Sequence, residues 1–184
     1  MKIRISPDCV LYMTALLLSR NSLFAATLLS AAFHELGHIL AARLMHIPLK
    51  SIELNIMGAK LTPAGMLPSY SAELCLSAAG PLFSILLWGI LLPHGGAFAA
   101  AARAATLSFA LFNLLPINGF DGGRVLSCIV APLLGVRRTE RVGAVCSYLS
   151  LLLLFSLSSC MLLRYGESLS LTVLCASLFA RLFL

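Results

Sequence analysis

The chain has 184 residues, of which 60% are hydrophobic and only 11% are charged. Its mean hydropathy is +0.98, whereas an ordinary soluble domain carries about 25% charged residues. This composition excludes a soluble globular protein and indicates an integral membrane protein with a single folded domain. The net charge of +6 does not indicate nucleic-acid binding, because the basic residues are scattered between apolar runs and form no basic stripe.

Apolar runs separated by turn residues predict an all-α polytopic membrane protein with about six transmembrane helices. The expected helices cover residues 9–19, 23–45, 74–92, 97–115, 142–163 and 168–184. The first of them is short, and needs Ile5 and a snorkelling Arg20 to reach across a bilayer. In the third, the pair Gly80-Pro81 should kink the helix or let another backbone approach closely.

Residues 49–67 have a different pattern, because Ile52, Leu54 and Ile56 alternate with polar residues before Gly58. An alternation of period two that is followed by a glycine predicts a short, membrane-associated β-hairpin after the second helix. An unstructured loop is the alternative. Further along, Pro116 ends the fourth helix, and a basic loop is expected before the fifth.

Six spans would place both termini on the same side of the membrane. Ten of the thirteen Lys and Arg residues would then lie on that side. The positive-inside rule therefore predicts that both termini are cytoplasmic. If the short first helix does not cross the membrane, the predicted side of the membrane reverses for that segment.

The second expected helix carries the pentapeptide His34-Glu35-Leu36-Gly37-His38. Residues four apart on a helix differ by about 40° in azimuth, so both imidazoles face one side. Two such histidines can bind one tetrahedral metal ion, and the adjacent glutamate can act as a base on a water molecule. Ionisable residues at membrane depth are costly and mark functional sites. We therefore predict a Zn²⁺ site with Glu35 as the general base.

Catalytic zinc usually has three protein ligands. Asp121 is the best third ligand in the sequence, because it follows a helix break beside an apolar span. Its alternative role is to cap the next helix. Asn113, two turns earlier, could bind the substrate backbone or a developing oxyanion, or it could form an interhelical hydrogen bond. The hairpin residues Ile52, Leu54 and Ile56 could pair with an unwound substrate.

The pentapeptide and the later segment Asn113-Leu-Leu-Pro-Ile-Asn-Gly-Phe-Asp121-Gly-Gly resemble the site-2 protease family of intramembrane zinc metalloproteases. Ala79-Gly80-Pro81-Leu82 is similar to a further signature of that family. The resemblance implies zinc at His34, His38 and Asp121, Glu35 as the base and Asn113 in the active site. Many relatives carry Asn after Gly-Pro-x-x, where this chain has Ser84.

Within that family, the sequence is most similar to the bacterial sporulation-type group, the stage IV sporulation protein FB-like proteases. The length of the chain predicts one transmembrane metalloprotease domain over residues 1–184 without a PDZ or CBS domain, whereas sporulation-type members usually carry a C-terminal CBS domain. The resemblance implies a location in the bacterial cytoplasmic membrane. It implies cleavage of membrane-anchored regulatory proteins, such as a sporulation sigma-factor precursor, and is compatible with a membrane regulatory partner. Two alternatives are a catalytically silent zinc-binding scaffold and a metal transporter, although a silent scaffold does not need Glu35.

Overall fold

The computed structural model describes residues 2–5, 14, 22–55, 58–63, 65 and 69–165. The chain forms two compact units, Met1–Leu114 and Leu115–Leu184. The elements of the first unit are β1 (Lys2–Ile5), α2 (Ser22–Leu44), β2 (Leu49–Asn55), β3 (Gly58–Pro63), α3 (Tyr70–Leu91) and α4 (Ala97–Asn113). The second unit contains α5 (Asp121–Leu134) and α6 (Val136–Tyr165).

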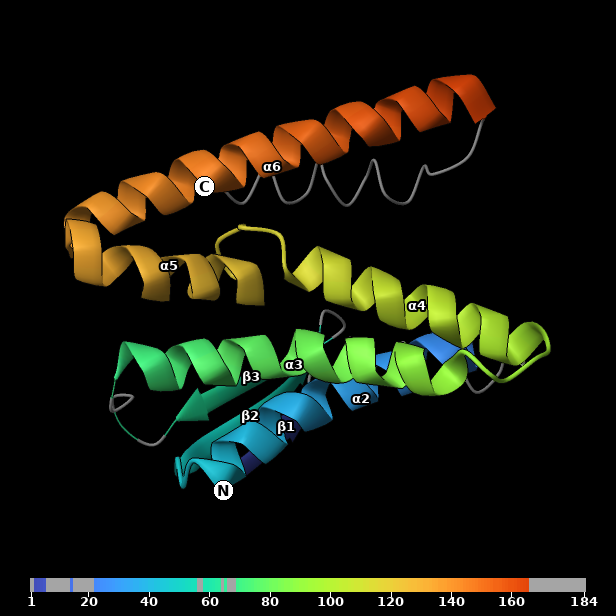
Figure 1. The fold of residues 1–184 in the computed structure, drawn as a ribbon, viewed down its shortest axis with the longest axis horizontal. Coiled ribbons are helices and arrows are strands. Elements are labelled where there is room, and N and C mark those ends of the chain that lie inside the picture. Colours follow the sequence, from blue (N-terminus) through green and yellow to red (C-terminus); the bar gives the residue numbers. More distant parts are fainter. Residues whose placement is uncertain are drawn as a thin grey trace. The chain divides into compact units, whose positions relative to one another are not determined.

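Helices α2, α3 and α4 pack against one another in the first unit (Figure 1). Small and polar residues let α2 and α4 approach closely, as is common between membrane helices. The hydroxyl of Ser30 on α2 donates to the carbonyl of Ala26 at 2.8 Å and lies 3.5 Å from that of Ala102 on α4. Ser30, Ala102 and Thr106 are all fully buried.

Helix α3 begins at an N-cap serine and continues through Pro81. The Ser69 hydroxyl accepts a hydrogen bond from the backbone N–H of Ala72 at 3.1 Å, which satisfies one of the free donors at the helix start. On the facing helix, Gly37 allows close contact with α3, because a Cβ there would lie 2.6 Å from the carbonyl oxygen of Ala79. Gly80 itself faces the side chains of His34 and His38 and not a neighbouring backbone.

Three strands form one sheet in the order β1-β2-β3. Strand β2 pairs antiparallel with β3, with Leu54 opposite Ala59, in the segment for which a hairpin was expected. It also pairs in parallel with β1, with Ile5 opposite Leu54. The assignment of Ile5 to the first transmembrane helix is therefore wrong, because this residue lies in a strand. Parallel strands need a long connection, and α2 lies in it.

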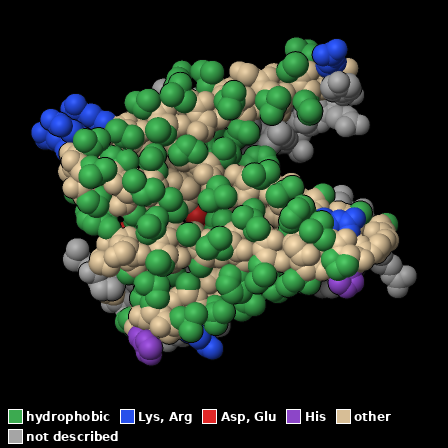
Figure 2. All heavy atoms as spheres, in the orientation of Figure 1, with side chains coloured by type: hydrophobic (Ala, Val, Ile, Leu, Met, Phe, Trp, Pro, Cys, Tyr) green, Lys and Arg blue, Asp and Glu red, His purple; other side chains and the backbone are tan. Residues whose placement is uncertain are grey.

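Three helices in the described part of the chain are long and apolar enough to cross a membrane: Phe24–Leu44, Tyr70–Leu91 and Val136–Arg164. Helix α4 is apolar but shorter. Hydrophobic side chains cover much of the surface seen in Figure 2. The exposed hydrophobic residues include Leu82 on α3 and Leu153 on α6. The first and sixth expected helices lie outside the described residues, except for Thr14, so the number of six spans stays a prediction.

The second unit contains a helix that the sequence analysis did not predict. Helix α5 begins at Asp121, directly after the turn around Gly119, whose φ is +98°. In this turn the backbone N–H of Asn118 donates to the Ser147 hydroxyl on α6 at 2.8 Å. Helix α6 begins at Val136, so the three arginines expected in a loop, Arg137, Arg138 and Arg141, lie in its first two turns.

Candidate metal centre

Two imidazoles meet on the buried face of α2, within a helix long enough to span a membrane. His34 is 2% exposed and His38 is 7% exposed. Their Nε2 atoms are 3.3 Å apart, and the rings lie edge to face with centroids 5.0 Å apart. The helical spacing of the pentapeptide therefore brings both ligand nitrogens to one point.

Helix α3 fixes the other nitrogen of each ring. The Nδ1 of His38 lies 2.8 Å from the Leu76 carbonyl oxygen. Because a carbonyl oxygen only accepts, this Nδ1 carries the proton and the neutral ring presents a lone pair at Nε2. The Nδ1 of His34 lies 2.9 Å from the Ser84 hydroxyl. The His34 ring also lies near Phe109 of α4, with the centroids 6.1 Å apart and the ring planes tilted by 49°.

Gly80 leaves the space in front of the two Nε2 atoms open. A Cβ built on this residue would overlap the Nε2 of His38 and would lie 2.7 Å from the Nε2 of His34. Gly80 is itself buried. The absence of a side chain at this position therefore keeps room beside both ligand atoms.

The two-histidine geometry fits a zinc ion. With Zn–N distances of 2.0–2.1 Å and tetrahedral angles, two coordinating nitrogens are about 3.3–3.4 Å apart, and the observed separation is 3.3 Å. Metal-binding histidines usually donate their second N–H to a carbonyl or a polar side chain, as the partners of Nδ1 here allow. The residues present are therefore suitable for zinc.

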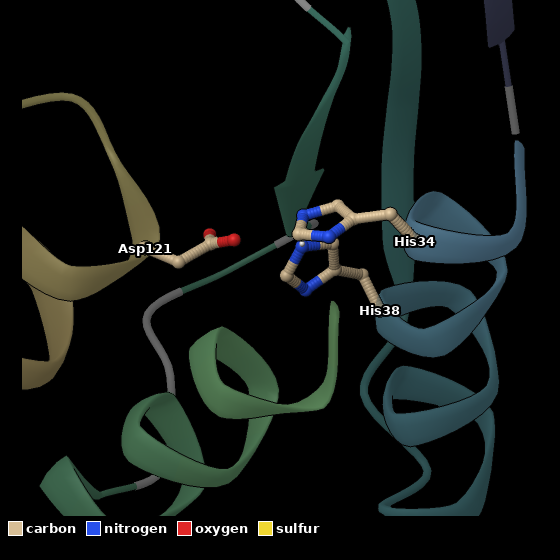
Figure 3. Close-up of side chains that lie close together, drawn as sticks. All are labelled: His34, His38 and Asp121. Atoms are coloured by element: carbon tan, nitrogen blue, oxygen red, sulfur yellow. Dashed lines mark hydrogen bonds between the residues drawn. The ribbon is translucent and has the colours of Figure 1, made fainter. Parts of the chain in front are cut away.

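Asp121 is the first residue of α5. Phe120 occupies the N-cap position and makes no side-chain cap hydrogen bond, so the alternative role of Asp121 as an N-cap is wrong. The side chains of His34, His38 and Asp121, the three predicted ligands, are drawn in Figure 3. Zinc accepts a carboxylate beside two imidazoles, so Asp121 stays the predicted third ligand.

The other predicted site residues come from three elements. Glu35 follows His34 on α2 and is partly buried, with its Oε2 atom shielded from solvent. Asn113 is the last residue of α4, and its amide donates to the Phe109 carbonyl at 3.1 Å. This hydrogen bond lies within α4. It is not the interhelical hydrogen bond that was considered for Asn113.

Ile52 and Leu54 lie on β2, the middle strand of the sheet, and Ile56 lies outside the described residues. Ser84 and the Leu76 carbonyl were not among the predicted site residues, although both contact the histidines. A signal for the first was present, because Ser77 and Ser84 stand seven residues apart in an apolar helix and hence on the same face.

The fold of this chain is similar to that of a protein of known structure. The chain matches the structure of the site-2 protease from Methanocaldococcus jannaschii with a TM-score of 0.65 and 23% identity. The match covers 96% of this chain and 87% of that one. The chain therefore has the fold of that site-2 protease. No family model matches the sequence.

Two further proteins are similar to this chain in sequence. A zinc metalloprotease of Methanocaldococcus jannaschii is 29% identical over 138 residues, which are 67% of this chain. A Synechocystis protein named as a candidate zinc metalloprotease is 35% identical over 117 residues, which are 58% of this chain. The matches span 40% and 30% of those relatives. Both support the family that the motifs predict.

Proposed function

We propose that this protein is an intramembrane zinc metalloprotease that hydrolyses peptide bonds of membrane-bound regulatory proteins. The observation that carries this proposal is the convergence of the two histidine Nε2 atoms at 3.3 Å beside Glu35 on a membrane-length helix. The similarity to two proteins named for zinc metalloprotease activity supports the same conclusion.

His34, His38 and Asp121 would hold the zinc ion. Three protein ligands leave a fourth position for water or substrate, which distinguishes a catalytic zinc site from a closed structural one. A bound zinc ion supplies Lewis acidity, which polarises a carbonyl group and makes water more acidic. The missing side chain at Gly80 would leave room for an ion next to both histidines.

Glu35 would move the proton during hydrolysis. Its carboxylate accepts a proton from the attacking water as the new C–O bond forms. It then gives that proton to the leaving nitrogen as the C–N bond breaks, so the products are an acid and an amine. A scaffold has no need of this residue, and a transport pathway would need further polar residues along a pore.

Asn113 and the sheet would bind the substrate backbone. The Asn113 carboxamide has a second N–H and a carbonyl oxygen beyond the bond to Phe109, and these groups can replace the partners that a helical peptide loses on unwinding. Strand β2 pairs on both edges in the described residues. A substrate strand would therefore add at the outer edge of β3, with Ile52 and Leu54 supporting it from β2.

Comparing the wild type with Glu35→Gln tests this function. Both proteins would be co-expressed with tagged single-span substrates, including a membrane-tethered sigma-factor precursor, the substrate that the sporulation-type resemblance suggests. We expect a cleaved fragment from the wild type and none from Glu35→Gln. Purified samples of both proteins should contain equal zinc, because glutamine in place of Glu35 removes the base and leaves the ligands in place.

Glu140→Gln is the matched control, because it makes the same chemical change on the exposed surface of α6. It should cleave like the wild type. Equal zinc in all three proteins, with no fragment from any substrate, would favour the silent scaffold. Cleavage by Glu35→Gln at the wild-type rate would refute the assignment of the base.

A further inference from the structure

The serine that departs from the family signature contacts the metal centre directly. Ser84 is fully buried on α3, and its hydroxyl lies 2.9 Å from the Nδ1 of His34. We propose that Ser84 is a positioning residue, which accepts the Nδ1–H of His34 and thereby directs the Nε2 lone pair to the metal ion. This inference rests on the zinc site of the proposed function.

The two histidines are fixed by partners of different chemistry. His38 faces the Leu76 carbonyl oxygen, which accepts only and permits a single neutral tautomer. His34 faces a hydroxyl, which can donate as well as accept. The Leu76 carbonyl belongs to the backbone, so it is present whatever the side chain at that position. The Ser84 hydroxyl belongs to a side chain, so a substitution can remove this partner of His34.

Loss of the hydroxyl would affect His34 in two ways. With alanine at position 84, a buried Nδ1–H has no acceptor at this point, which penalises the tautomer that binds metal. The ring also loses the bond that sets its rotation. Removal of such a partner from a metal-binding histidine typically lowers metal affinity by about 10–100-fold, so we expect a loss of that size.

A purely structural role for Ser84 would be to provide a small side chain between packed helices. Ser77 allows the two roles to be distinguished. It lies on the same helix, is 1% exposed, and its hydroxyl has no hydrogen-bond partner among the described residues. Ser77→Ala and Ser84→Ala thus remove the same atom from equally buried positions, and only one removal affects a histidine.

The test measures zinc affinity of the full-length wild type, Ser84→Ala and Ser77→Ala by competition with a chromophoric chelator. We expect Ser84→Ala to bind zinc at least 10-fold more weakly and Ser77→Ala to bind within about twofold of the wild type, since it loses no partner of a ligand. In ¹⁵N-histidine spectra of the metal-free proteins, the tautomer signals of His34 should change in Ser84→Ala and those of His38 should not.

Equal zinc affinity of Ser84→Ala and the wild type would overturn the proposal, as would an equal loss in both variants. A wild type that binds no zinc would overturn it together with the proposed function. A wild type that binds zinc but cleaves no substrate would refute the protease alone, and the affinity ratio of the two variants would still decide the role of Ser84.

Discussion

At the scale of single residues, the site depends on one position without a side chain. Gly80 faces both Nε2 atoms, and a β-carbon there would overlap the Nε2 of His38. Gly89 is on the same helix, but a Cβ on it would meet nothing within 4 Å. The two glycines therefore separate the effect of a blocked site from the effect of a glycine lost from α3.

We expect Gly80→Ala to abolish stoichiometric zinc binding, because its methyl group overlaps the Nε2 of His38. Gly89→Ala should bind zinc like the wild type. Zinc content of the purified proteins, measured by atomic emission with helix content by circular dichroism, checks both. A Gly80→Ala protein with one bound zinc per chain would show that the metal lies elsewhere.

At the scale of the elements, α2 is held between two helices by different means. Against α3 it uses Gly37 and the two anchored imidazoles, and against α4 it uses Ser30 beside Ala102. These contacts leave no room for larger side chains, since interiors are close-packed. The position of the histidines thus depends on small residues at both helix contacts.

Ala102→Leu should destabilise the protein by about 1–3 kcal/mol, because the larger side chain cannot fit between α2 and α4. Ala104→Leu is the matched substitution two residues later, where the side chain is exposed, and it should leave stability nearly unchanged. Thermal unfolding in detergent measures both. The account of this interface would fail if the two variants had the same midpoint.

Parts of this architecture followed from the sequence and parts did not. The pentapeptide on α2 was predictable because helical spacing alone places His34 and His38 on one face. Helix α5 was missed, because Pro116, Gly119 and the glycines after Asp121 are typical of a loop. Its start is stabilised by a contact distant in sequence, from Asn118 to Ser147. Strand β1 was also missed, because its pairing with β2 joins segments that are distant in the sequence.

At the scale of the whole molecule, a zinc ion bound only by the folded chain should stabilise the fold. Free zinc at about 100 times its dissociation constant would add about 2.7 kcal/mol by mass action. Removal of zinc with 1,10-phenanthroline should therefore lower the unfolding midpoint by several degrees, and added zinc should restore it. His34→Ala should have a low midpoint that neither treatment changes. An identical response in the wild type and His34→Ala would contradict a site at this histidine.

The most direct test of the central claim is the position of the bond that the purified protein cleaves. Wild-type protein would be reconstituted with a single-span substrate, and the products would be identified by mass spectrometry. We predict cleavage within the apolar span, which stops on zinc removal and in Glu35→Gln. Cleavage only outside the span, or the same products from Glu35→Gln, would contradict an intramembrane zinc protease with Glu35 as its base.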